Sequence, residues 1–159
     1  MPMERFIVSL LGHRTIDNAL AVEQKLENQI KPLLCEKEYV DFLVGRDGEF
    51  DLLAASVIHR LKKTYREDNS ALIWVQPYET AEYRRHEPDY LAYYDEVRIC
   101  ESIHYKSAFQ QRNRAMIDQS ELVIVYVGRQ NGGAYQALQY AQKCHKQIVN
   151  LYEKIADYT

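Results

Sequence analysis

Four short segments carry the residue types that could bind a ligand, and each directly follows an apolar run. Gly12, His13 and Arg14 follow the run RFIVSLL, and residues 45–51 (GRDGEFD) follow YVDFLV. Residues 76–79 follow a third run, and residues 128–135 (GRQNGGAY) follow a fourth. Glycine permits close backbone approach, arginine binds phosphate in a bidentate manner, and a carboxylate accepts hydrogen bonds from hydroxyls. These residue types fit a ligand that combines a phosphate with a ribose.

Each glycine-containing segment has two interpretations, a turn between a strand and a helix or a loop that holds a ligand. Glycine is common in any such turn because it tolerates positive φ. The functional interpretation needs backbone N–H groups at a helix N-terminus that point toward an anion. Residues 132–135 begin a predicted helix with Gly-Gly-Ala, so we predict a phosphate site there. For Gly45 and Gly48 both interpretations stay open.

Three other side chains also have two interpretations. Arg112 falls on the apolar stripe of a predicted helix over residues 105–116, where it either reaches solvent at the stripe's edge or clamps a phosphate or carboxylate. His13 is either a surface residue or a donor to the ligand. Asp51, in the first turn of its helix, either complements the helix dipole or accepts ribose hydroxyls.

Apolar runs and helical patterns alternate along the chain, so the four candidate binding segments are expected to lie just after the ends of strands. Strands are predicted at 5–12, 39–45, 71–77, 95–100, 121–128 and 147–152. Helices are predicted at 17–34, 50–61, 105–116 and 134–141, with Thr15 or Asp17 as the first cap. Residues 78–94 are expected to be an irregular, tyrosine-rich excursion.

The strand patterns predict an α/β fold, namely a Rossmann-like, doubly wound, mainly parallel sheet with helices on both faces. The strands are nearly continuous apolar runs, which is typical of a parallel sheet that is covered on both sides. In such a sheet the carboxyl ends of all strands meet at one rim, and ligands bind there. The segments that follow the strands should therefore converge.

Composition describes an ordinary globular chain. Its 159 residues, 47% of them hydrophobic, predict a single domain over residues 1–159. A net charge of -3 argues against general nucleic-acid binding. Three separated cysteines without a metal-ligand pattern predict reduced thiols, no metal site and a cytoplasmic location. No apolar run is long enough for a signal peptide or a membrane span.

The segments LLGHR, VGRDGEFDLLAA and RNRAMIDQSELVIVYVGRQNGGAYQALQYA (residues 112–141) resemble the SLOG superfamily. These are Rossmann-like nucleotide-binding domains related to the cytokinin-activating LOG proteins, and the nearest branch looks like the small bacterial YpsA-like proteins. The resemblance implies a nucleotide or ADP-ribose-like ligand. It implies the following ligand-binding residues: Gly12, His13, Arg14, Gly45, Arg46, Gly48, Asp51, Arg112, Gly128, Gly132, Gly133, Ala134 and Tyr135.

Within this set, different residues are expected to contact different parts of the ligand. We expect Arg46 to contact an anion or to cover the ligand from the side, because it stands where SLOG relatives commonly have a second glycine. Asp51 is expected to face ribose hydroxyls, and Gly132 and Gly133 to form the turn that faces the phosphate.

The resemblance does not supply a reaction. LOG-type phosphoribohydrolases carry a Pro-Gly-Gly-x-Gly-Thr-x-x-Glu signature, whereas this chain has GRQNGGAYQAL, without the threonine or the glutamate. Aligned with nucleoside deoxyribosyltransferases, Ala137 stands where a nucleophilic glutamate would be, and alanine cannot form a glycosyl intermediate.

We therefore expect a sensor or regulatory module that binds a nucleotide-derived small molecule without a cofactor. Whether the protein is an enzyme stays open. One alternative is a nucleotide-processing hydrolase, acting on an N-glycosidic bond or a phosphate ester, with acid–base chemistry from Asp47, Asp51, Glu79 or His13. A second is a partner-binding protein with a vestigial site. No membrane partner is expected, and a homo-oligomer would fit the way related proteins associate.

Overall fold

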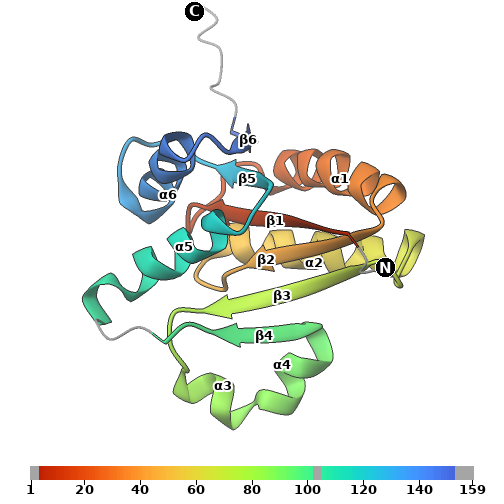
Figure 1. Cartoon of the computed structure of the whole chain (residues 1–159), viewed down its shortest axis with the longest axis horizontal. Helices are drawn as coiled ribbons and strands as arrows, with labels where there is room; N and C mark the ends of the chain where they lie inside the picture. Colours follow the sequence, from red (N-terminus) through yellow and green to blue (C-terminus); the bar gives the residue numbers. More distant parts are fainter. Residues whose placement is uncertain (1–3, 102–104, 153–159) are drawn as a thin grey trace, which may run out of the picture.

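The computed structural model describes residues 4–101 and 105–152, which build one six-stranded sheet (Figure 1). The strand order is β4-β3-β2-β1-β5-β6, and each neighbouring pair is parallel. The predicted α/β, Rossmann-like fold is confirmed. The strands are β1 (Arg5–Gly12), β2 (Tyr39–Val44), β3 (Ser70–Gln76), β4 (Glu96–Ile99), β5 (Leu122–Tyr126) and β6 (Gln147–Asn150).

The helices cover both faces of the sheet, as a parallel sheet requires. Two helices, α1 (Ala19–Glu36) and α2 (Glu49–Tyr65), lie on one face. Two others, α5 (Ala108–Asp118) and α6 (Gly132–Lys143), lie on the opposite face, and a 3-10 turn η1 (Tyr105–Ser107) precedes α5. The chain therefore changes direction at β1, because β2 lies on one side of β1 and β5 on the other.

The central strands contribute to two separate hydrophobic cores because their side chains alternate between the faces. On the first face, Val8, Phe42 and Ile124 pack in one cluster with residues of α1 and α2. On the second face, Leu43 and Val123 pack in another cluster with residues of α5 and α6. These side chains are fully buried, so both layers fix the sheet and hold its carboxyl edge in place.

Residues 78–94 are not irregular, which corrects that prediction. They contain α3 (Ala81–Arg85) and α4 (Glu87–Tyr93), which lie beside β4 (Figure 1). The segment is ordered by Trp74, whose ring centre lies 5.7 Å from that of Tyr83 and 5.0 Å from that of Tyr90. Helices this short leave too few periodic positions for the pattern to be recognised in the sequence.

The cap of α1 also differs from the prediction. The N-cap is Asn18, in the left-handed region at φ 57°, rather than Thr15 or Asp17. Its side-chain oxygen accepts a hydrogen bond from the backbone N–H of Ala21 at 3.3 Å. Asparagine is as favourable an N-cap residue as aspartate, and it tolerates the left-handed conformation better than most residues.

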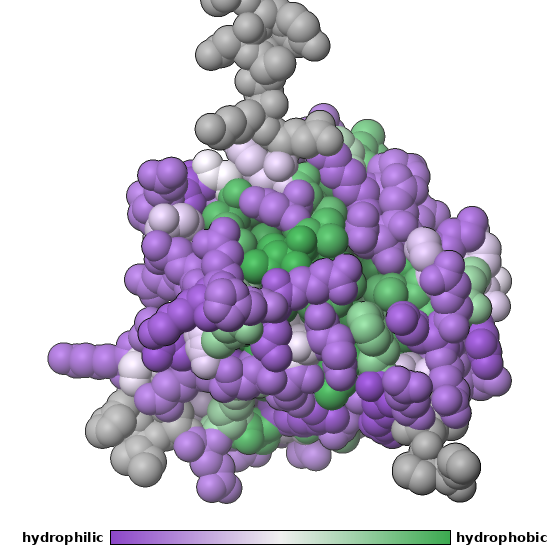
Figure 2. All heavy atoms as spheres, turned by 45° about the horizontal axis from the view of Figure 1, so that its top comes forward, coloured by the Kyte–Doolittle hydropathy of each residue, from purple (hydrophilic) through white to green (hydrophobic). Residues whose placement is uncertain are grey.

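The face of the molecule drawn in Figure 2 is mostly polar. Figure 2 shows hydrophilic side chains over most of the visible face, with hydrophobic residues in hollows between them. No helix in the described part of the chain is both long enough and apolar enough to span a membrane.

Candidate functional site

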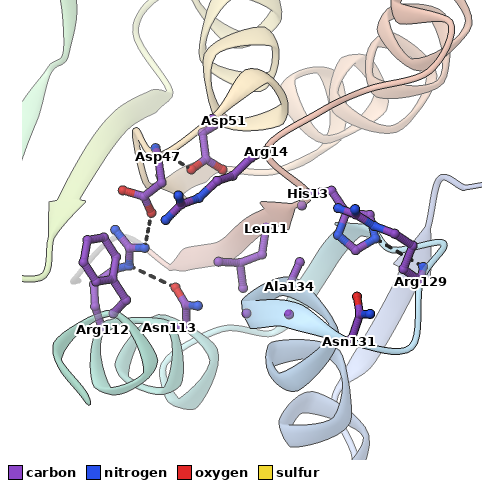
Figure 3. A pocket seen from close by; sticks show the side chains of 15 residues that line it. Leu11, His13, Arg14, Asp47, Asp51, Arg112, Asn113, Arg129, Asn131 and Ala134 are labelled. Atoms are coloured by element: carbon purple, nitrogen blue, oxygen red, sulfur yellow. Dashed lines mark hydrogen bonds and ion pairs between the residues drawn. The ribbon is translucent and has the colours of Figure 1, made fainter. Parts of the chain in front are cut away.

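A cavity of about 410 Å³ opens at the carboxyl edge of the sheet, at the ends of β1 and β5 (Figure 3). This is the point where the strand order reverses, because the connections from β1 and β5 lead to opposite faces of the sheet. The predicted ligand-binding residues that line it are Gly12, His13, Arg14, Gly48, Asp51, Arg112, Gly132, Gly133 and Ala134.

His13 holds two loops of the cavity together. Its side chain is only 7% exposed, and its Nε2 accepts hydrogen bonds from the backbone N–H groups of Gly128 at 3.0 Å and Arg129 at 3.3 Å. Burial lowers the pKa of His13, and the nearby charge of Arg129 lowers it further. A neutral imidazole with its proton on Nδ1 fits this arrangement, since a protonated Nε2 could not accept. Nε2 is therefore committed to the protein backbone rather than to a ligand.

The loop after β2 forms a cluster of charges with α5. Arg112 is 2% exposed and makes an ion pair with a carboxylate oxygen of Asp47. It also donates to the backbone carbonyl of Val75 at 3.1 Å and to the side-chain oxygen of Asn113 at 2.9 Å. The guanidinium is therefore buried and paired with Asp47. It does not reach solvent at the edge of the helix stripe, and it is not an unpaired charge that waits for a phosphate.

Gly45 lies behind this cluster and leaves room for it. A Cβ atom at Gly45 would lie 2.9 Å from Asp51 Oδ2, 3.0 Å from Arg112 Nη1 and 3.2 Å from Asp47 Oδ2. Any side chain at this position would push these groups apart. The glycine is thus explained by the packing of the cluster, and Gly45 does not line the cavity.

Asp51 is a buried carboxyl group at the wall of the cavity. Its Oδ2 accepts the backbone N–H of Asp47 at 3.0 Å, while its Oδ1 has no hydrogen-bond partner among the described residues. Burial raises the pKa of Asp51 to about 7, and the charge of Asp47 adds to the rise, whereas Arg112 and Arg14 oppose it. The group can therefore change protonation state near neutral pH.

The N-terminus of α6 forms the opposite wall. Gly132 has φ +88°, a conformation that favours glycine, and a Cβ at Gly132 or Gly133 would have no atom within 4 Å. Asn131, the N-cap residue, makes no side-chain cap hydrogen bond, and the first turn of the helix contains no acidic residue. In the described chain the backbone N–H groups of Gly132, Gly133 and Ala134 donate to no protein acceptor. Such groups attract an anion.

Two further arginines border the cavity and make no ion pair among the described residues. Arg14 and Arg129 both line it and are exposed, and within residues 4–101 and 105–152 neither makes an ion pair. Figure 3 shows Arg14 extending toward the cavity from the side of Asp51, and Arg129 beside His13. Among the described residues that line the cavity, three are arginines and two are aspartates, so positive charge exceeds negative charge there.

Three other predicted residues lie away from the cavity. The guanidinium of Arg46 lies over the ring of Tyr90 at 5.0 Å, on the other side of the β2–α2 loop from Asp47. Gly128 lies against the ring of Tyr152. Tyr135 packs beside the second core, and its hydroxyl accepts from the Gln139 amide at 3.1 Å.

The cavity also contains residues that the sequence did not single out as binding residues. The sequence indicates Asp47 only as a candidate catalytic group, and Arg129 and Asn131 only as parts of the loop at residues 128–135. The apolar side of the cavity was missed because Leu11 and Phe109 look like ordinary core residues in the sequence. Asn113 follows Arg112 directly and could have been found from the Arg-Asn pair. The added lining residues are Leu11, Asp47, Phe109, Asn113, Arg129 and Asn131.

Comparison with known proteins supports the fold class. Scans of the chain against protein-family models and against curated proteins found no match. Among solved structures, DNA processing protein A from Helicobacter pylori, described for its single-stranded DNA binding mode, matches with a TM-score of 0.66 and 16% identity over 95% of this chain and 67% of that chain. DNA processing protein A (DprA) from Streptococcus pneumoniae matches with a TM-score of 0.67 and 15% identity over 96% of this chain and 52% of that chain.

These likenesses define the class of the protein and no more. At such low identity they show a Rossmann-like α/β fold, which is consistent with a SLOG-type domain. The chain spans about two thirds of the first protein and about half of the second.

One prediction about partners was wrong. The net charge of -3 predicts no general nucleic-acid binding, yet a protein of the same fold binds single-stranded DNA. Net charge is a poor guide here because the arginines gather at the carboxyl edge of the sheet, where the local balance is positive. The net charge therefore gives no argument against nucleic-acid binding.

Proposed function

We propose that the cavity binds a nucleotide through its phosphate, and that the protein acts as a sensor or regulatory module. The observation that carries this proposal is the convergence of two unpaired arginines and the open N-terminus of α6 in one cavity. Arg14 and Arg129 supply charge, and the α6 N–H groups supply directed donors. A cavity of about 410 Å³ is of the size that a small ligand requires.

The remaining lining suits the rest of a nucleotide. Leu11 and Phe109 offer apolar and aromatic surface for a base. Asp51 lines the cavity, and its buried, unpartnered Oδ1 would accept a ribose hydroxyl after a small movement of the side chain. The single-stranded DNA bound by the H. pylori protein is itself a chain of nucleotides, which supports this ligand class. Membership of the SLOG superfamily, near its YpsA-like branch, is part of the same proposal.

Isothermal titration with AMP, ADP-ribose and NAD tests the proposal. The variant Arg14→Ala/Arg129→Ala should lose at least about tenfold in affinity, since a hydrogen bond to a charged group contributes about 1.5–3 kcal/mol. As a matched control, Lys63→Ala/Arg66→Ala removes two positive charges at and beyond the C-terminal end of α2. Absence of binding for every nucleotide in a folded wild-type sample would reject the proposal.

A nucleotide hydrolase is a second candidate, and Asp51 is the observation that favours it. A buried carboxyl group with a pKa of about 7 can both donate and accept a proton near neutral pH. If the protein is a hydrolase, a nucleotide panel should yield free base or free phosphate. Asp51→Asn should then still bind the nucleotide and lose turnover. If the wild-type protein binds nucleotides without hydrolysing them, the hydrolase is rejected and the sensor function remains.

A further inference from the structure

A second groove of about 200 Å³ continues from the cavity between α5 and α6. It is lined from α5 by Phe109, Asn113 and Arg114, and from α6 by Gly133 and Tyr140, among others. Three of its residues, Phe109, Asn113 and Gly133, also line the main cavity. The two hollows are therefore neighbours that share a wall, and one ligand could occupy both.

The groove has its own positive charge. Lys106 and Arg114 line it, both are exposed, and neither has an ion pair within the described residues. The guanidinium of Arg114 lies over the ring of Tyr140 at 5.0 Å, and the Tyr140 hydroxyl donates to Asp118 Oδ1 at 2.5 Å. This stacking holds the charge of Arg114 along the groove.

An aromatic ring stands where the two hollows meet. Phe109 is 39% exposed, and its ring lies 6.1 Å from that of Tyr78 in an edge-to-face arrangement. The guanidinium of Arg112 lies over the Phe109 ring at 5.5 Å. The ring is thus held from two sides while it remains partly open to solvent. Exposed aromatic rings beside positive charge are the features with which proteins bind single-stranded nucleic acid.

We infer that the groove between α5 and α6 takes a second nucleotide, so that the preferred ligand is a single-stranded oligonucleotide of two or more units rather than a mononucleotide. This inference rests on the proposed function, because the first phosphate lies at the N-terminus of α6. The base of the first nucleotide stacks on Phe109, and the phosphate of the second nucleotide meets Lys106 and Arg114. The polar amides of Gln110 and Gln136 line the same groove and provide donors without sequence selectivity.

The test compares thymidine monophosphate with 5′-phosphorylated dithymidylate by titration at a fixed salt concentration. The dinucleotide should bind wild-type protein at least about tenfold more tightly, since charge-assisted hydrogen bonds from Lys106 and Arg114 to the second phosphate contribute at least that much. Lys106→Ala/Arg114→Ala should remove this gain and leave the affinity for the mononucleotide unchanged. Lys63→Ala/Arg66→Ala is the charge-matched control and should keep the gain, and circular dichroism verifies that each variant is folded.

Other results of these titrations contradict either the inference alone or the proposed function as well. Equal affinity for the two ligands, or a gain that survives in the groove variant, overturns this inference while the proposed function stands. A gain for NAD, whose nucleosides are joined by pyrophosphate, without a gain for dithymidylate also overturns it. If neither the monophosphate nor the dinucleotide binds, and AMP, ADP-ribose and NAD fail as well, the proposed function falls too.

Discussion

At the scale of single residues, Asp51 gives a prediction about pH. Its pKa is raised from 3.8 to about 7 by burial, so the folded state binds more protons than the unfolded state between these values. Stability from this group is therefore present below about pH 4 and is lost as the pH rises through 7, which is opposite to the usual aspartate. We expect Asp51→Asn to melt several degrees higher than wild type at pH 8 and nearly equally at pH 4.

Thermal unfolding at the two pH values checks this. Asparagine can still accept the Asp47 N–H through its side-chain oxygen, so the local structure should survive the change. A variant that is less stable than wild type at pH 8 would show that Asp51 is a paired carboxylate after all.

His13 gives a second prediction, with the opposite dependence on pH. Burial lowers its pKa below 6.5, so the stability it contributes is present above pH 6.5 and is lost as the pH falls through the folded-state pKa. Protonation would break the two hydrogen bonds that Nε2 accepts from the β5–α6 loop. We expect nucleotide affinity to weaken as the pH falls below 6.5 and through the lowered pKa of His13, because this loop then loosens.

A pair of variants separates this role from packing. His13→Leu should cost about 1–3 kcal/mol in the free energy of unfolding, because two backbone donors lose their acceptor. His13→Gln should restore part of that loss and should remove the pH dependence of binding. If His13→Gln binds with the same acid dependence as wild type, His13 does not set it.

The two glycines at the start of α6 should behave differently. Gly132 has φ +88°, so Gly132→Ala should destabilise the protein by about 1 kcal/mol through backbone strain. At Gly133 a Cβ would meet nothing within 4 Å, so Gly133→Ala should fold as well as wild type. It should nevertheless weaken nucleotide binding, because the added methyl group lies where the phosphate approaches. Melting temperatures measure the two stability effects, and titration measures the nucleotide affinity. If Gly133→Ala binds nucleotide as tightly as wild type, the phosphate does not lie next to Gly133.

At the scale of elements, Arg46 belongs to a different part of the molecule from the one its sequence position suggests. Its guanidinium lies over Tyr90 of α4 and lines a separate apolar hollow. We expect Arg46→Ala to leave nucleotide affinity within about twofold and to loosen α3 and α4. Hydrogen exchange of residues 81–93 measures the second effect. A large loss of affinity would instead support the original expectation that Arg46 contacts the ligand.

Arg46 and Asp47 illustrate what the sequence can and cannot predict. Strand and helix positions followed from apolar periodicity, and the parallel sheet then placed the loops at one edge. The direction of each side chain within a loop depends on local dihedral angles, which periodicity does not encode. Arg46 and Asp47 are neighbours in sequence, yet one meets a tyrosine and the other meets Arg112.

At the scale of the whole molecule, the same distinction explains the error about nucleic acid. A sum over 159 residues gives -3, whereas function depends on where the charges lie after folding. Three arginines from distant parts of the chain meet at the main cavity, and Lys106 and Arg114 continue the positive surface along α5. Only the three-dimensional arrangement brings them together, so no count of residues could have shown it.

The central claim is that the cavity recognises a phosphate on a nucleoside, and titration with AMP and adenosine side by side tests it most directly. The two ligands share base and ribose, so any difference in affinity belongs to the phosphate. The account predicts that AMP binds at least about tenfold more tightly than adenosine, and that this advantage disappears in Arg14→Ala/Arg129→Ala. Equal affinity for AMP and adenosine in the wild-type protein would contradict it.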